Sequence, residues 1–572
     1  MIVHFLSTIA GNVPNICLST YSWLADTKQR KASLLPFAAA GIACFIALST
    51  GCGGSPAKIA DVGDSDPTPP PPDQHSMVVP TYHNDNSRSG VNTQETKLTP
   101  AGVNLVSFGR KAVVPVEGAI FAQPLYIDGV TMTDGKTHDL VVVATEHNQV
   151  YAIDADTYQI MWQRNFLGSQ GLVKTAQDLF CGETFNSEIG ITGTPVIDPS
   201  SETVYMVAVT KDMVGGQPQF AQTLYALRLK DGQNSVAPAT ISTPSGSQFG
   251  TATFDPLLNF QRAALLLANG NVYVSWASHC EAHAGWLMAF NATTLRLSSA
   301  WAPDPSGMLG GIWMAGGGPS ADADGNIFLA VGNGWSDAQS GGTDYGDTVV
   351  RLRDSGNIIT VADYFMPYDW EKLYDDDLDV GSGTPVLLPS QPGTPHPNLL
   401  ITGDKEGNLY LLDRDNMGQW HPDNDDQVVQ HFQIQSTGVM NTPVFWNNTL
   451  YYGLMLLPVQ SFAYDPASQT INTTPLSASP TSLWYPGVFP SLSANNGSDA
   501  ILWAVENPTT DPPSSLILRA FDASDLSTEL YNSEMSPGRD SAGHALRFTV
   551  PTVANGQVFV GARDELDIYG VL

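Results

Sequence analysis

Short runs of alternating apolar and polar residues, separated by turn residues, recur along most of this 572-residue chain. The stretch at residues 141–162, VVVATEHNQVYAIDADTYQIMW, shows the pattern best. Residues 141–144 form a β-branched run that predicts a strand, and residues 146–148 form a polar turn. Residues 150–153 alternate and predict the second arm of a hairpin, and a third strand ends at Trp162. A sheet this small exposes one side and cannot stand alone, so we expect the unit to recur.

A proline in a similar setting marks the repeats of this unit. These prolines lie 47 to 71 residues apart except for one interval of 124, and they are Pro124, Pro195, Pro319, Pro385, Pro443, Pro490 and Pro551. Residues 262–267, RAALLL, lie within the double interval and lead into the same Asn-Gly turn and aliphatic strand. The chain therefore contains eight units, and repeats of this length indicate a propeller, a solenoid or another array.

The strands follow the same order in each unit, with the proline-bearing strand first and two further strands paired after short turns. Proline is acceptable in that strand if it lies at an inner edge facing a channel, because no neighbouring strand needs its N–H. No sustained helical periodicity follows residue 81. We therefore predict an all-β fold, an eight-bladed β-propeller with four-stranded antiparallel blades. The last unit ends on its third strand, so residues 105–116, LVSFGRKAVVPV, are predicted to complete the last blade and close the ring.

The first 80 residues have a different pattern. A basic run at residues 28–31 precedes an apolar stretch at residues 32–48 and then small residues before Cys52. This order predicts an export signal in residues 1–52 that resembles a bacterial lipoprotein signal, in which Cys52 is lipidated. An uncleaved anchor and a cleavage without lipid are the alternatives. Residues 53–80 are rich in proline and predict an extended tether, which leaves residues 81–572 as the propeller, held outside the cytoplasm on a membrane or secreted.

Charge and cysteine content narrow the possible partners. There are 25 Lys and Arg residues against 56 Asp and Glu residues, a formal net charge of −31, which argues against a nucleic acid partner. Such a surface is compatible with divalent cations, or it serves solubility alone. Cys181 and Cys280 are the two cysteines of the body, and they form either one disulfide or two separate buried thiols. Neither has the spacing of a metal site, so no metal ligands are predicted.

The turn of the best unit carries a family resemblance. The spacing of Ala152, Asp154, Thr157 and Trp162 resembles the tryptophan-docking motif of quinoprotein-type propellers, the pyrroloquinoline quinone (PQQ) repeat family. The resemblance implies that the tryptophan packs on the next blade and that the other residues fix the turn, although Tyr158 replaces the usual glycine. Other units keep parts of this motif, at Asp413 with Trp420 and at Asp522. The similarity covers residues 81–572 and is greatest to uncharacterised secreted PQQ-like repeat proteins of environmental bacteria.

The same resemblance implies a possible cofactor. Quinoprotein alcohol dehydrogenases hold PQQ in the central channel with Ca²⁺ or a lanthanide, bound by Glu, Asn and Asp, and usually have a vicinal disulfide. This chain has no Cys-Cys pair and no Cys-x-x-Cys-His haem motif, which counts against that branch. The candidate cofactor-binding residues near the predicted inner strands are Glu188, Trp313, Asp379 and Lys405. Solvated strand ends for the carboxylates and inter-blade packing for the tryptophan are the structural alternatives.

Three functional classes follow, and the last of them is some other extracytoplasmic enzyme built on a propeller. The first is an exported cell-envelope propeller that binds or scaffolds, recognising a protein, peptide or glycan with one face and reaching the membrane through its N-terminal lipid. The alternative is a PQQ- and Ca-dependent dehydrogenase that oxidises alcohols or sugars. No Gly-x-Ser-x-Gly or His-Glu-x-x-His motif is present, so the sequence shows no hydrolase active site that these motifs would mark. No catalytic residue is predicted.

Overall fold

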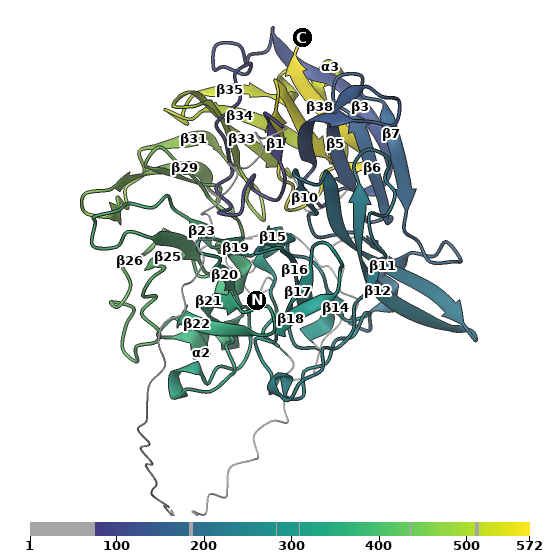
Figure 1. Cartoon of the computed structure of the whole chain (residues 1–572). Helices are drawn as coiled ribbons and strands as arrows, with labels where there is room; N and C mark the ends of the chain where they lie inside the picture. The colour runs from purple at the N-terminus through teal and green to yellow at the C-terminus, as the bar shows by residue number, and fades with distance from the viewer. Residues whose placement is uncertain (1–74, 182–186, 282, 308, 435–437, 509–513) are drawn as a thin grey trace, which may run out of the picture. The chain divides into compact units, whose positions relative to one another are not determined.

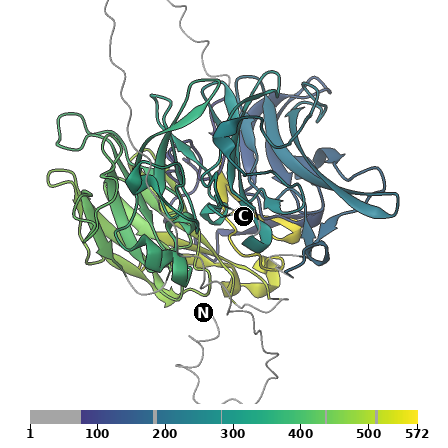
Figure 2. The ribbon, with the colours of Figure 1, turned by 90° about the horizontal axis from the view of Figure 1, so that it is seen from below.

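Eight mainly antiparallel sheets of four or five strands follow one another along the chain and form the ring of an eight-bladed propeller (Figures 1 and 2). The computed structural model describes residues 75–181, 187–281, 283–307, 309–434, 438–508 and 514–572. The expected signal in residues 1–52, with Cys52, lies outside the described residues. The predicted fold class is confirmed.

Each blade is described from its innermost to its outermost strand. Blade 1 contains β1 (Val78–Val79), β4 (Leu125–Thr131), β5 (Thr137–Ala144), β6 (Gln149–Asp154) and β7 (Ile160–Asn165). Blade 2 contains β10 (Val196–Asp198), β11 (Thr203–Val214), β12 (Gln217–Arg228) and β13 (Ala239–Thr240). Blade 3 contains β14 (Asn259–Phe260) and β15 (Leu266–Ala268), then β16 (Asn271–Ser278), β17 (Trp286–Asn291) and β18 (Leu297–Trp301). Blade 4 contains β19 (Ser320–Ala321), β20 (Ile327–Ala330), β21 (Val349–Asp354) and β22 (Ile359–Phe365).

The second half of the ring repeats this order. Blade 5 contains β23 (Val386–Leu387), β24 (Leu399–Gly403), β25 (Asn408–Asp413) and β26 (Gln430–Gln433). Blade 6 contains β27 (Val444–Trp446), β28 (Thr449–Tyr452), β29 (Pro458–Asp465), β30 (Thr470–Ile471) and β31 (Ser477–Ser482). Blade 7 contains β2 (Val91–Asn92), β32 (Ser491–Asn495), β33 (Ser498–Glu506), β34 (Ile517–Asp522) and β35 (Glu529–Asn532). Blade 8 contains β36 (Thr552–Ala554), β37 (Gln557–Gly561), β38 (Arg563–Val571) and β3 (Phe108–Ala119).

The remaining elements lie in connections between strands. They are the pair β8 (Lys174–Thr175) and β9 (Glu188–Ile189), the helices α2 (Trp370–Asp376) and α3 (Pro537–Asp540), and the 3₁₀ turns η1 (Ala176–Asp178), η2 (Ser247–Phe249), η3 (His279–Glu281), η4 (Met314–Gly316), η5 (Ala338–Ser340), η6 (Val380–Ser382) and η7 (Ser533–Met535). The sequence shows no periodicity for α2 because the helix has only seven residues, of which Trp370 and Leu373 are buried. No helix in the described part of the chain is long and apolar enough to cross a bilayer.

Neighbouring blades pack through buried aliphatic side chains. Between blades 1 and 2, Ile127, Val142 and Ala152 contact Val204 and Leu227, and all five are at most 2% exposed. Both faces of a central strand are therefore covered, which explains why strands such as β16 are buried at every position.

The predicted tryptophan docking is present in blade 1. Asp154 Oδ1 accepts hydrogen bonds from the N–H and the hydroxyl of Thr157, which fixes the turn, and Tyr158 adopts a φ of 63° where the family usually has glycine. Trp162 Nε1 donates to the carbonyl of Leu229 in blade 2 at 2.6 Å, and its ring covers Gly232. The motif aspartates Asp413 and Asp522 accept hydrogen bonds from backbone N–H groups two residues later in the same way.

Trp420 docks differently. Its Nε1 donates to the carbonyl of Tyr368, which precedes blade 5, at 3.3 Å, so it does not pack on the following blade. The cause is the long connection at residues 414–429, which runs back along blade 4 and donates from Gln419 N to the carbonyl of Tyr364 at 2.9 Å.

The ring is closed as the sequence predicts. β3, from the N-terminal region, pairs antiparallel with β38, the last strand, and Val114 lies opposite Leu566. The strand begins at Phe108 and extends to Ala119, slightly later than the expected residues 105–116. Both ends of the chain therefore contribute to blade 8.

A second N-terminal closure, not visible in the sequence, runs along the inner edges of all eight blades. We call residues 77–95 the strap. It starts as β1 against β4 and ends as β2, parallel to β32, with Asn92 Nδ2 donating to Val553 O of blade 8 at 2.9 Å. Residues 75–80, expected in the tether, are thus part of the propeller. In five blades the residue two positions after the repeated proline donates its N–H to a strap carbonyl; these donors are Ile197, Ala321, Leu387, Phe445 and Leu492.

Arg88 fastens the centre of the strap. Its side chain is fully buried and makes five hydrogen bonds, two to Pro319 O and one each to Leu265 O, Tyr82 O and Thr81 Oγ1. These bonds join the strap to blades 3 and 4. Because the strap contacts the inner strand of every blade, it lies within the channel that those strands enclose.

Two ends of the ring must be distinguished. Neighbouring strands within a blade are mainly antiparallel. The connection from the second to the third strand of a blade therefore lies at one end of the ring, and the connection from the outermost strand to the innermost strand of the next blade lies at the same end. We call this end the loop face, and the opposite end, which carries most of the short turns, the turn face. The chain enters the described region at the turn face, where Ser76 N donates to the Asp128 carboxylate at 3.0 Å.

Replacing Arg88 tests the strap. Arg88→Met leaves buried carbonyl oxygens without donors, so we expect it to lower the free energy of unfolding by about 3–5 kcal/mol, measured by urea denaturation. The exposed Arg296→Met is the control and should leave the midpoint nearly unchanged. Equal midpoints for Arg88→Met and wild type would show that the strap does not hold the ring.

Replacing Trp162 tests the docking of blade 1 on blade 2. Trp162 is half-buried, so we expect Trp162→Ala to cost about 2–3 kcal/mol, less than the loss of a fully buried aromatic side chain. The same substitution at the exposed Trp484 should be close to neutral in thermal melting. Similar losses for the two variants would contradict the docking.

Candidate functional site

All four candidate cofactor-binding residues lie on the loop face. Glu188 is in β9 before blade 2, Trp313 precedes β19, and Asp379 precedes β23. Lys405 lies in the connection between β24 and β25. Four separate connections therefore bring these side chains to the same end of the ring.

Glu188 is paired with a histidine of blade 1. His147 Nδ1 lies 3.0 Å from Glu188 Oε2, and both side chains are about one-third exposed, at 29% and 32%. Ile189, the next residue, packs with Phe260, whose ring meets Trp313 edge-on at 5.8 Å. An apolar cluster thus lies between Glu188 and the other candidates.

Asp379 and Lys405 form an ion pair within an acidic cluster. Lys405 Nζ lies 2.5 Å from Asp379 Oδ2 and 2.6 Å from Asp377 Oδ1, and Asn333 Nδ2 donates to the same oxygen of Asp377 at 2.9 Å. Burial lowers the pKa of Lys405, but the two aspartates outweigh it and hold that pKa above its ordinary value. We call Asn333, Asp347, Asp377, Asp379 and Lys405 the acidic cluster.

Asp347 is the most deeply buried carboxyl of this cluster. Its carboxyl is fully buried and has no described partner with good hydrogen-bond geometry, apart from a weaker interaction with the backbone of Gly334. Burial first, and the neighbouring charge of Asp379 second, raise the pKa of Asp347 well above its ordinary value. One ammonium therefore serves three carboxyl groups.

Trp313 lies next to the acidic cluster. A Cβ atom added to Gly332 would lie 3.2 Å from Asp379 Oδ1 and 3.4 Å from Trp313 Cδ1, so both side chains flank this glycine. The structure thus brings Trp313, Asp379 and Lys405 together and keeps Glu188 with His147. Asn333, Asp347 and Asp377 carry no clear sequence signal, because the first two lie in a Gly-rich loop without a motif and the third lies in an acidic run typical of solvated loops.

A buried carboxyl, Glu146, and a buried guanidinium, Arg262, lie on the same face. Glu146 Oε2 accepts hydrogen bonds from Gly190 N at 2.6 Å and Thr192 Oγ1 at 2.9 Å. Burial raises the pKa of Glu146 from 4.5 to about 7, and these two bonds and the charge of Arg262 only moderate the rise. Arg262 lies 5.1 Å from the centre of the Phe548 ring. Titratable side chains with strongly shifted pKa values cluster at functional sites.

A disulfide joins two connections of the loop face. Cys181 and Cys280 are bonded, with Cα atoms 5.6 Å apart, so the alternative of two free thiols does not hold. The bond links the connection that carries Glu188 to the connection between β16 and β17. The neighbouring His279 stacks on Phe260 at 4.1 Å, beside Trp313.

The acidic cluster can be compared with the needs of PQQ and Ca²⁺. Ca²⁺ prefers oxygen ligands, and Asn333 Oδ1 is buried without a hydrogen-bond partner while the Asp377 side chain is 67% exposed. A cation and a flat aromatic ring, Lys405 and Trp313, are also present. These residue types fit the cofactor. In the described residues, however, no group of three or more His, Cys, Asp or Glu side chains has metal-binding geometry.

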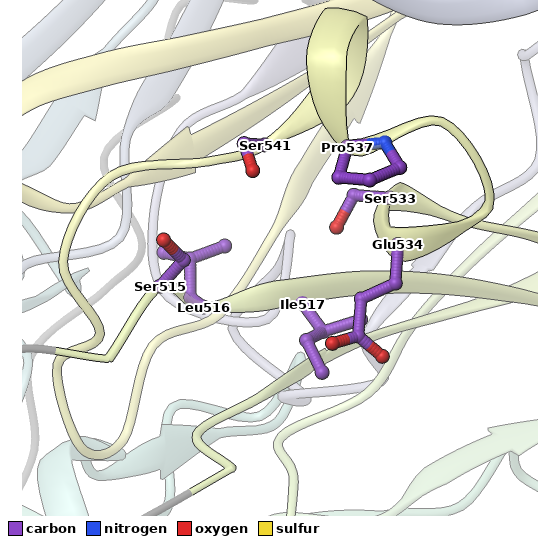
Figure 3. A pocket seen from close by; sticks show the side chains of 7 residues that line it. All are labelled: Ser515, Leu516, Ile517, Ser533, Glu534, Pro537 and Ser541. Carbon is purple, nitrogen blue, oxygen red and sulfur yellow. The ribbon is translucent and has the colours of Figure 1, made fainter.

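A hollow of about 300 Å³ lies elsewhere, at the edge of blade 7 (Figure 3). It is formed by β34, η7 and α3 and lined by Ser515, Leu516, Ile517, Ser533, Glu534, Pro537 and Ser541. This volume is at the lower end of the range for small-molecule sites, and none of the candidate residues lines it.

Exposed aromatic side chains are confined to the loop face. Among the described residues only four aromatic side chains are exposed, and they are Phe180, Trp335, Tyr368 and Trp484. Each lies in a connection that leads to the loop face, whereas the exposed large side chains of the turn face, such as Leu297 and Ile358, are aliphatic. The two ends of the ring thus differ in chemistry.

A pH titration of Glu146→Gln tests the buried carboxyl. The folded state keeps the proton to about pH 7 and the unfolded chain releases it near pH 4.5, so this group lowers wild-type stability as pH rises through that window. The difference corresponds to about 3 kcal/mol. Glu146→Gln should therefore gain stability relative to wild type between pH 5 and pH 8 in urea denaturation, unlike the exposed Glu371→Gln. Parallel pH profiles for wild type and Glu146→Gln would contradict the shifted pKa.

Comparison with solved structures gives similar propellers. Quinohemoprotein alcohol dehydrogenase from Comamonas testosteroni matches with a TM-score of 0.57 and 14% identity, over 86% of this chain and 80% of that one. Quinohemoprotein alcohol dehydrogenase ADHIIG from Pseudomonas putida HK5 matches with a TM-score of 0.54 and 12% identity, over 87% and 81%. BamB from Moraxella catarrhalis gives a TM-score of 0.45 at 12% identity, over 81% and 99%.

No family model and no curated protein matches this sequence. Since the identities to solved structures are all low, the similarity establishes architecture and not activity. The chain has the eight-bladed, PQQ-like propeller fold of the quinoprotein alcohol dehydrogenases.

Proposed function

We propose that this protein is an extracytoplasmic binding module that recognises a partner with its loop face. The observation that carries the proposal is the confinement of all exposed aromatic side chains of the described residues to that face. Exposed aromatic rings are enriched at recognition surfaces, because they supply a large contact area at a small cost in conformational entropy.

Trp335 lies against another ring, and Trp484 is next to a tyrosine that packs under a cation. Trp335 is 56% exposed and meets the buried Trp370 ring edge-on at 5.5 Å. Trp484 is 53% exposed, and its neighbour Tyr485 packs under Arg547 at 5.2 Å. Supported rings of this kind lose little freedom when a partner binds.

The strap supports the same assignment. Tyr82, His83 and Arg88 lie within the channel and are at most 2% exposed, so these strap residues offer no surface to a partner. The exposed aromatic residues of the loop face do offer such a surface. The described chain enters at the turn face, so an anchor at Cys52 would not have to occupy the loop face. Export and lipidation at Cys52 remain part of this proposal.

A PQQ- and Ca-dependent dehydrogenase is the second candidate. The unpartnered Asn333 Oδ1 beside Asp377 favours it. In that case Asn333 and Asp377 would hold the metal and Lys405 and Trp313 would contact the quinone, which supplies a two-electron oxidant when bound, while Glu188 lies beyond the apolar cluster. Lys405 is already neutralised by two carboxylates, and Glu188 is paired with His147. We therefore place this function second.

Site-specific crosslinking in the source cells tests the leading proposal. A photoreactive phenylalanine analogue replacing Trp335 or Trp484 should give discrete adducts, and the same analogue at Leu297 or Ile358 on the turn face should not. Equal adducts from both faces, or none from the loop face, would contradict recognition by the loop face.

Cofactor addition separates the two functions. Purified full-length protein is mixed with PQQ and Ca²⁺, and thermal melting and dye-coupled oxidation of alcohols and sugars are recorded. We expect no saturable rise in melting temperature and no turnover. A saturable rise with turnover that is lost in Lys405→Ala would establish the dehydrogenase instead.

A further inference from the structure

We propose that the loop face of blades 4 and 5 docks a basic protein segment that carries Arg or Lys side chains. The inference rests on the proposed function and names its partner. The surface consists of Trp335, Tyr368, Glu371, Asp375, Asp376 and Asp377, and we call it the α2 surface. All six residues are exposed.

Two aromatic rings form the apolar part of the α2 surface. Trp335 is 56% and Tyr368 43% exposed. Trp335 is held by the buried Trp370 of α2, and the carbonyl of Tyr368 accepts the Trp420 Nε1–H at 3.3 Å. The Trp335 ring is thus fixed to the scaffold, the backbone of Tyr368 is held by a hydrogen bond, and both rings present free surface to solvent.

The charge around these rings is strongly negative. Residues 369–379, DWEKLYDDDLD, contain six carboxylates and one lysine. That lysine, Lys372, is paired with Glu406 and lies 3.9 Å from Asp369, so it does not offset the exposed aspartates. The last turn of α2 contains no basic residue, and the partial negative charge of a helix C-terminus adds to the field.

Asp347 adds a buried carboxyl close to the charges of Asp377 and Asp379. This fully buried carboxyl lacks a well-formed hydrogen bond and interacts electrostatically with Asp377, Asp379 and Lys405. Only the Lys405 ammonium balances these three carboxyl groups. A ligand cation that reaches Asp377 would reduce the negative charge of the exposed side and would favour the ionised form of the buried Asp347.

A guanidinium or ammonium group matches this combination. One such group can stack on the Trp335 ring as a cation–π contact, and others along the same segment can pair with the carboxylates of Asp375, Asp376 and Asp377. Opposite charge also speeds encounter and disfavours acidic partners. Neutral sugars would use the rings but not the charge, so dependence on both features is specific to a basic partner.

Binding of a labelled octa-arginine peptide to the purified full-length protein tests the proposal. We compare wild type, Trp335→Ala and the double variant Asp375→Asn/Asp376→Asn by fluorescence anisotropy at low and high salt. Both variants should bind the peptide about tenfold more weakly, and high salt should weaken binding to wild type. The changed residues are exposed, and melting temperatures confirm that the variants fold.

Matched controls distinguish a site from general attraction to an acidic protein. Leu297→Ala removes an exposed apolar side chain of the turn face, and Asp499→Asn/Asp525→Asn removes two exposed charges of the same face. Both controls should change the affinity less than about twofold. Equal losses in the turn-face and α2 double variants, or an unchanged affinity in Trp335→Ala, would overturn the proposal.

The peptide-binding test and the crosslinking test can fail independently of each other. If octa-arginine does not depend on the α2 surface but crosslinks still form from residue 335, the partner is not basic and recognition by the loop face stands. If crosslinks form from neither loop-face position, the proposed function itself falls.

Discussion

The hydrogen bonds between the strap and the innermost strands are the constraint on which this ring depends. A propeller has no covalent closure, and each innermost strand presents an unpaired edge to the channel. Here one N-terminal segment contacts that edge in every blade, and Arg88 fastens its centre to blades 3 and 4. The outer closure of β3 on β38 then completes blade 8. Because both closures come from residues 77–119, the order of the whole ring depends on the N-terminal region.

The blades could be predicted from sequence because each repeat carries its own signals. Turn residues, alternating strands and the repeated proline are local features, and the proline shows which strand has a free edge. The strap could not be predicted in this way. Its central sequence, YHNDNSRSG, has no strand pattern, and its partners are carbonyl and N–H groups of distant blades that every sequence possesses. Only the closed ring places these groups around the segment.

The candidate site was predicted in part for a similar reason. Connections that precede innermost strands converge at one end of a propeller, so Trp313 and Asp379 could be selected from their position alone. Their actual partners could not, because Asn333, Asp347 and Asp377 owe their importance to burial and to mutual charge. The loop face consequently combines supported aromatic rings with uncompensated carboxylates, while the turn face receives the incoming chain. This difference between the two faces is the basis for assigning recognition to the loop face.

Native-state hydrogen exchange of the inner-edge amides tests the central role of the strap most directly. The relevant N–H groups are those of Ile197, Ala321, Leu387, Phe445 and Leu492. If the strap closes the ring, these amides exchange only with global unfolding, at the same free energy as the amides of buried strands such as β16 and β33. Fast and independent exchange at these five positions, with the neighbouring strands still protected, would contradict the account.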